Sequence, residues 1–151
     1  MANRSTETRI ADTIRRLESE PDVWIASASA DGVPHLIPLS LAWDGSRILL
    51  ATPPESPTAR NIVATGWARA SLAATDDVVI VVASATVTPF EDTPGEVADL
   101  FAERAGWDPR QEGGRWSLLT LTPETIHAWR GEPELGGRTI MRHGEWVGEQ
   151  P

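Results

Sequence analysis

Two Asp-Gly pairs near the start of the chain constrain its fold more than any other feature. Asp31-Gly32 and Asp44-Gly45 separate three apolar, strand-like runs at residues 23–29, 35–43 and 47–52. Glycine supplies the positive φ angle that a tight hairpin turn requires, and Asp-Gly is a favoured pair at such turns. The pattern therefore predicts an antiparallel meander. It disfavours a parallel sheet, in which strands would alternate with helices.

The rest of the chain fits a single domain that is mainly β with a few helices, because 151 residues are too few for two typical domains. We expect a first helix over residues 5–20, in which Ile10, Ile14 and Leu17 share one face. The further expected elements, in chain order, are a barrel core at 22–90 with a short helix at 58–65, a helix at 94–105, and C-terminal strands at 116–122, 125–130 and 138–147 within the segment 115–147. Short strands with hairpins first predict an antiparallel barrel decorated by helices.

The composition excludes several classes of chemistry. The chain has no cysteine, which excludes disulfides, thiolate nucleophiles and cysteine-ligated metals. All 13 basic residues are arginine and tyrosine is absent, which excludes lysine Schiff bases and tyrosine acid–base catalysis. A formal charge of −9 disfavours nucleic-acid binding. No apolar leader or membrane-length apolar run is present, so we expect a cytoplasmic protein that does not enter a membrane.

Familiar catalytic motifs are also missing. The sequence contains no glycine-rich dinucleotide loop, no P-loop and no Gly-x-Ser-x-Gly elbow. His35, His127 and His143 are scattered without metal-ligand spacing, so we expect no metal site. If the chain is an enzyme, a bound cofactor is expected to carry its chemistry, and no catalytic side chain is assigned.

One segment has the composition of an anion-binding site. After Thr52, a loop with three prolines leads into the start of the short helix. That start offers hydroxyls, a guanidinium and free backbone N–H groups, which are suited to a phosphate. Its candidate ligands are Ser56, Thr58, Arg60 and Asn61. The same pattern fits a helix capped by Ser56 or Thr58 with Arg60 in solvent, and both interpretations stay open.

Taken in order, the motifs from residue 10 to 87 resemble the pyridoxamine 5'-phosphate oxidase-like family of flavin-binding split barrels. The motifs that carry the resemblance are Asp22-Val23-Trp24-Ile25-Ala26-Ser27, Gly32-Val33-Pro34-His35, Leu36-Ile37-Pro38-Leu39, Ala51-Thr52, Arg60-Asn61-Ile62 and Arg69-Ala70-Ser71-Leu72. The later segment from residue 114 to 142 is similar to the tail of actinobacterial members.

The resemblance implies a homodimer of split barrels with two equivalent cofactor sites between the subunits. It places the cofactor ring against the second and third strands, at His35, Leu36, Ile37, Pro38, Leu39, Ser40, Ala51 and Thr52. It places the phosphate at Ser56, Thr58, Arg60 and Asn61. Many members carry a basic residue where Thr58 stands here, and often another where Pro57 stands. Their absence weakens the charge of the phosphate site.

The function implied is an FMN-dependent oxidoreductase that acts on an unidentified small molecule. F420 is the alternative cofactor, although its anionic oligoglutamate tail favours a more basic groove than this acidic chain offers. An alternative of another class is a binding or storage protein that holds a flavin or haem without turnover, and the missing basic residues favour it. A third alternative is a barrel dimer without a small ligand.

Several large side chains have two interpretations. Tryptophans are enriched in cores and interfaces, and packing is the plain interpretation of the seven in this chain. Trp116 and Trp129 are the candidates for contact with the cofactor, because the resemblance implies that C-terminal strands approach the partner's site. Arg69 is expected either in an interface ion pair or near the cofactor ring.

Overall fold

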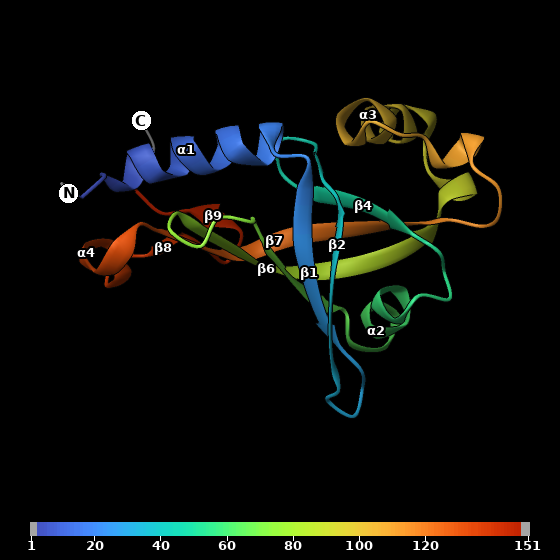
Figure 1. Ribbon diagram of the computed structural model, residues 1–151, viewed down its shortest axis with the longest axis horizontal. Coiled ribbons are helices and arrows are strands. Elements are labelled where there is room, and N and C mark those ends of the chain that lie inside the picture. Colours follow the sequence, from blue (N-terminus) through green and yellow to red (C-terminus); the bar gives the residue numbers. More distant parts are fainter. Residues whose placement is uncertain (1–2, 149–151) are drawn as a thin grey trace.

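An antiparallel sheet of nine strands organises the molecule, with the path β2-β1-β5-β6-β7-β4-β3 and the β8–β9 hairpin attached to β7. The computed structural model describes residues 3–148. The strands are β1 (Asp22–Ala28), β2 (Pro34–Ser40), β3 (Ala42–Trp43), β4 (Ile48–Thr52), β5 (Trp67–Ser71), β6 (Val78–Pro89), β7 (Ser117–Trp129), β8 (Thr139–Arg142) and β9 (Glu145–Trp146). The curled sheet is the predicted antiparallel split barrel (Figure 1).

Both Asp-Gly pairs form the predicted turns. Gly32 and Gly45 have φ angles of 87° and 101°, which a residue with a Cβ rarely adopts. In the second turn, the Asp44 carboxylate accepts hydrogen bonds from the backbone N–H groups of Ser46 and Arg47, at 2.9 and 2.6 Å. The turns thus determine the hairpins β1–β2 and β3–β4.

The run predicted as one strand over 35–43 is two strands. β2 pairs with β1, whereas β3 pairs with β4 at the other end of the sheet path. The chain changes partner at Leu41, whose backbone N–H donates to the Pro21 carbonyl at 2.9 Å. The sheet therefore has to curl until β2 lies beside β4, which closes the barrel. Because β2 is an edge strand, it tolerates the internal Pro38.

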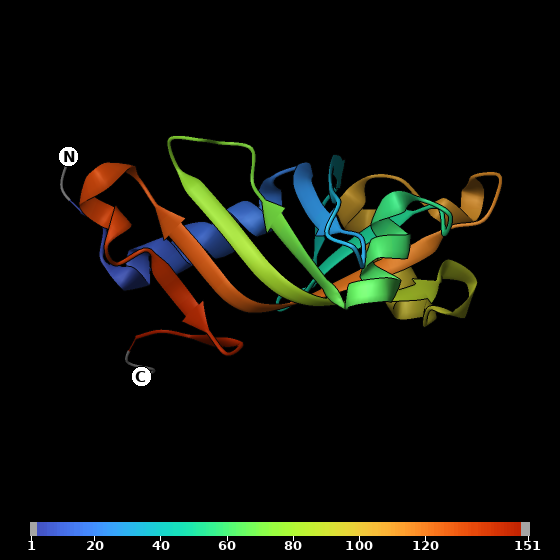
Figure 2. The same cartoon turned by 90° about the horizontal axis from the view of Figure 1, so that it is seen from below.

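The strands predicted at 116–122 and 125–130 are one strand, β7. Its pairing with β6 is continuous except at Glu124, which has no partner between Pro123 and Thr125. This bulge bends the strand and lets it curve with β6 along the barrel (Figure 2). Alternation is broken at the bulge, which explains why the sequence pattern indicated two strands.

The helices are α1 (Thr6–Ser19), α2 (Pro57–Thr65), α3 (Gly95–Ala105) and α4 (Gly131–Leu135), with 3-10 turns at Phe90–Asp92 and Pro109–Gln111. α1 and α4 lie at one end of the molecule, and α2 and α3 at the other (Figure 1). The buried side chains of α1 are Arg9, Thr13 and Leu17, so Leu17 is the fully buried member of the predicted face, while Ile10 and Ile14 are half-buried. The Arg9 guanidinium donates to the carbonyls of Ala128 and Gly137. Within residues 3–148, no helix is long and apolar enough to span a bilayer.

Two apolar clusters stabilise these elements, and β4 contributes to both. Ile48 and Leu50 belong to the cluster inside the barrel, with Leu17, Ile25, Ile62 and Leu121 among its other members. Leu49 and Ala51 belong to a smaller cluster under α3, with Phe90, Phe101 and Leu118. β4 is therefore buried on both faces, which accounts for its unbroken apolar sequence.

Candidate functional site

A cavity of about 390 Å³ lies where the two edges of the curled sheet meet. Its lining residues are Asp22, Pro38, Leu39, Ser40, Ala51, Thr52, Pro53, Trp107 and Trp116. It brings together the end of β2, the end of β4 and the tryptophan that precedes β7. The register explains this meeting, because Thr52 pairs with Ser117 and so places Trp116 beside the end of β4.

Aromatic side chains form one wall of this cavity. Trp107 and Trp116 pack edge to face with their ring centroids 5.0 Å apart. Phe101 lies 5.8 Å from Trp107, and Phe90 lies 5.8 Å from Phe101, so the wall is anchored in the core under α3. The indole N–H of Trp116 donates to the Gly113 carbonyl at 3.3 Å. Its polar atom is thereby satisfied and its ring is held in place.

The start of α2 shows which of the predicted anion ligands face solvent. Ser56 is the N-cap, and its hydroxyl accepts from the Ala59 N–H at 3.1 Å. Thr58 is completely buried and its hydroxyl has no partner within residues 3–148, so it does not reach the surface as predicted. Asn61 also turns inward and donates to the Ser27 hydroxyl at 3.1 Å. Arg60 is exposed, and it forms no ion pair with the residues that the structure describes.

The family model described as pyridoxamine 5'-phosphate oxidase matches residues 10–130 of this chain. The chain belongs to the pyridoxamine 5'-phosphate oxidase family. The match extends from within α1 to the end of β7, and so it includes every strand that lines the cavity. No curated protein matches the sequence.

Solved structures with this fold are named for different ligands, namely F420, FMN and haem. An F420 reductase is 19% identical over 74% of this chain and 93% of its own, with a TM-score of 0.60. A pyridoxamine 5'-phosphate oxidase-related, FMN-binding protein from Nostoc punctiforme is 14% identical over 90% of this chain and 87% of its own, with a TM-score of 0.57. HutZ, the haem storage protein from Vibrio cholerae, is 14% identical over 80% and 94%, with a TM-score of 0.61. At these identities the likeness concerns the fold.

Arg115 is a charged residue of this family member that sequence reasoning missed. Its guanidinium Nη2 donates to the carboxylate of Glu55, in the loop between β4 and α2. The pKa of the Glu55 carboxyl lies below its ordinary value, chiefly because of a hydrogen bond from its own backbone and then because of Arg115 and Arg60. No sequence pattern indicated the Glu55–Arg115 pair, since its residues are 60 positions apart.

The predicted ring contacts on β2 divide between the two faces of the strand. His35, Ile37 and Leu39 are half-buried, whereas Leu36 is 60% exposed on the outer face. The half-buried His35 side chain has a ring Nε2 that is buried without a partner within residues 3–148. His35, Leu36 and Ile37 do not line the cavity, in contrast to Pro38, Leu39 and Ser40.

Trp129 lies far from Trp116 within the chain. It pairs with Val78 at the other end of β7. The 12-residue separation from Ser117 corresponds to roughly 40 Å along a strand. A contact between Trp129 and the cavity of a partner subunit stays a prediction.

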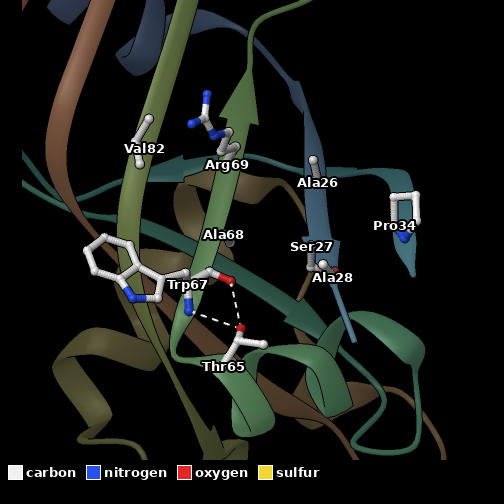
Figure 3. A pocket seen from close by; sticks show the side chains of 9 residues that line it. All are labelled: Ala26, Ser27, Ala28, Pro34, Thr65, Trp67, Ala68, Arg69 and Val82. Carbon is white, nitrogen blue, oxygen red and sulfur yellow. Dashed lines mark hydrogen bonds between the residues drawn. The ribbon is translucent and has the colours of Figure 1, made fainter. Parts of the chain in front are cut away.

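A second cavity, of about 480 Å³, opens on the outer face of the sheet (Figure 3). Its lining residues are Ala26, Ser27, Ala28, Pro34, Thr65, Trp67, Ala68, Arg69 and Val82. Trp67 and Arg69 extend from β5 at this cavity, and the Thr65 hydroxyl hydrogen-bonds the Trp67 backbone (Figure 3). Trp24, Leu36 and Trp67, exposed by 42%, 60% and 52%, make this face apolar.

Proposed function

We propose that this chain binds FMN in the cavity between β2 and β4 and acts as an oxidoreductase on a small molecule. The observation that carries the proposal is the convergence of Pro38, Leu39, Ser40, Ala51 and Thr52 with the Trp116 ring around one cavity in a member of this family. These segments are the ones that the family resemblance assigns to the cofactor ring.

The lining suits a planar, largely apolar ring. A volume of about 390 Å³ lies within the range of about 300–1,000 Å³ that is typical of small-molecule sites. Leu39, Pro38 and the two indoles supply apolar walls, and the Ser40 and Thr52 hydroxyls supply hydrogen-bonding groups. At the phosphate end, Arg60 is the exposed cation on α2. The residues present therefore fit a flavin ring better than they fit its phosphate.

The reaction would depend little on side-chain acids and bases. Asp22 is the one titratable side chain that lines the cavity within residues 3–148. A bound flavin supplies hydride transfer. The chain orients the reacting groups through the ends of β2 and β4, and its tryptophan wall excludes water from one side.

FMN fits this chain better than F420 does. The formal charge of −9 and the absence of lysine oppose an anionic oligoglutamate tail. The F420 reductase among the solved structures has the same fold, so fold alone does not decide between the two cofactors.

We propose further that two copies associate through the outer face of β1, β2 and β5. Exposed Trp24, Leu36 and Trp67 form an apolar surface around the second cavity, and such surfaces mark interaction sites. A second copy of the chain would bury this surface and complete the cofactor site between subunits, as the family resemblance implies.

A spectroscopic titration tests the proposal. Purified protein is titrated with FMN and separately with F420, while ring absorbance and fluorescence are recorded. Saturable binding of FMN with fluorescence quenching is expected, and Arg60→Ala should weaken it because it removes the exposed cation of α2. No binding of either cofactor at tens of micromolar would contradict the flavin site.

A flavin or haem storage function is the second candidate. Pro57 and Thr58 supply no charge at the phosphate end, and Thr58 is buried. A storage protein would bind its ligand without turnover. Reduction of the bound flavin by NADPH or reduced F420, followed by its reoxidation by an acceptor that is itself reduced in steady-state turnover, supports the enzyme, whereas a bound ligand that no donor reduces supports storage.

A further inference from the structure

Glu55 and Arg115 form an ion pair next to the proposed flavin cavity. Glu55 lies two residues after Pro53 and Arg115 lies one residue before Trp116, and both Pro53 and Trp116 line that cavity. The two side chains are exposed by 55% and 76%. The pair therefore joins the segments that follow β4 and precede β7 at the side of the cavity where α2 begins.

The Glu55 carboxylate is thus held by one cation just before the start of α2. The Arg115 guanidinium contacts it directly, and Arg60 forms no ion pair with it but contributes to lowering the pKa of the same carboxyl group. Glu55 directly precedes Ser56, the N-cap of this nine-residue helix. A guanidinium group and a helix N-terminus attract anions, and the anion that the structure places beside them is the Glu55 carboxylate.

We propose that Arg115 is a phosphate-binding residue of the flavin site and that Glu55 holds its place until a ligand phosphate displaces it. This inference rests on the proposed function. Arg115 supplies the cationic contact that Pro57 and Thr58 lack. The displaced carboxylate belongs to an exposed ion pair, and such pairs contribute little to stability, so a ligand phosphate can compete with it.

The proposal predicts opposite effects for the two partners of one ion pair. Glu55→Gln removes the competing carboxylate and its repulsion of the phosphate, and it should tighten FMN binding by about two- to fivefold. Arg115→Gln should weaken FMN binding by about the same factor. Mere loss of a structural ion pair would change the affinity in the same direction in both variants.

Riboflavin, which has the same ring and no phosphate, is the ligand control. Neither variant should change its dissociation constant, measured by fluorescence quenching in the same buffer. Arg110→Gln is the matched protein control, because Arg110 is an exposed arginine on the same connection that pairs with Asp99 and Asp108. It should leave FMN affinity unchanged.

The outcomes separate this inference from the proposed function. If the protein binds FMN but Glu55→Gln does not tighten it, or Arg115→Gln changes FMN and riboflavin equally, the inference is overturned and the flavin site stands. If neither the unmodified protein nor Glu55→Gln binds a flavin, the proposed function fails. In that case, the rise in the unfolding temperature on adding pyrophosphate tests whether an anion binds at Arg115. This rise should be larger in Glu55→Gln than in Arg115→Gln. Equal protection of the two variants overturns the inference.

Discussion

Glu134 of α4 is buried, and its carboxylate accepts from the Arg4 guanidinium at 2.8 Å. It also accepts from the backbone N–H groups of Arg4 and Arg130, at 2.9 and 2.7 Å. These hydrogen bonds, the one from the Arg4 side chain first, lower the pKa of Glu134 to about 2. A single carboxylate thereby fastens the segment before α1 to α4, although 130 positions separate them in the sequence.

The Glu134 site predicts acid-sensitive stability. Because the folded pKa of about 2 lies below the ordinary value of 4.5, the contribution is fully present above about pH 4.5 and is lost as the pH falls toward 2. Glu134→Gln should lower the free energy of unfolding by about 3 kcal/mol at pH 7, since it leaves Arg4 without its main buried partner. Urea unfolding at pH 7, 4.5 and 3 measures both effects. An equal pH dependence in the variant and the unmodified protein would count against this account.

The tryptophan wall leads to a prediction about affinity. Trp116→Leu removes the ring that packs against Trp107, and it should weaken FMN binding by about two- to tenfold because this indole lines the proposed flavin cavity. Trp146→Leu is the control, because Trp146 is a half-buried tryptophan of β9 that does not line this cavity. Flavin fluorescence titration measures the dissociation constant of FMN for each of the two variants. Equal affinities in both would exclude Trp116 from the site.

Whole elements show what the sequence could and could not predict. Turn chemistry predicted the two hairpins, and the helix predicted at 94–105 lies within one residue of α3. Both predictions succeeded because the positive φ angles of Gly45 and Gly106 end an element through the conformation of a single residue. The change of partner at Leu41 was missed, since alternation shows which face a residue occupies but not which strand it pairs with. The single strand β7 was predicted as two strands for a different reason, because the bulge at Glu124 breaks the alternation within it.

The N-cap of α2 leads to a prediction about the free energy of unfolding. Ser56→Ala removes the hydroxyl that accepts from the Ala59 N–H, and it should cost about 1 kcal/mol in the free energy of unfolding. Ser56→Asn retains an N-cap acceptor and should restore most of the loss. Denaturant unfolding of both variants measures this. Equal stability of Ser56→Ala and the unmodified protein would show that the cap contributes nothing.

The candidate site was only partly predictable, because a sequence pattern does not show which distant segments pack together. The resemblance assigned the ends of β2 and β4 to the cofactor ring, and the structure places both ends at one cavity. Trp107 and Arg115 were missed, since only the packing of α3 and the start of β7 brings them there. Thr58 was expected at the surface, but the first turn of α2 buries it against the barrel.

At the scale of the whole molecule, the outer sheet face predicts the assembly. Trp67→Glu places a charge in the apolar surface that includes Trp24 and Leu36, and it should convert the proposed dimer into a monomer. Val63→Glu is the control, because Val63 is 74% exposed on α2 and lies outside the second cavity. Size-exclusion chromatography with light scattering measures the mass of each. A monomeric unmodified protein, or a dimeric Trp67→Glu variant, would contradict the proposed interface.

A crystal structure of the protein with FMN would show where the flavin binds. We expect the flavin ring between the ends of β2 and β4, with Leu39 on one side and Trp116 on another, and the phosphate at the start of α2 near Arg60. A flavin bound elsewhere, or a cavity between β2 and β4 that stays without flavin at saturating FMN, would contradict the proposed site.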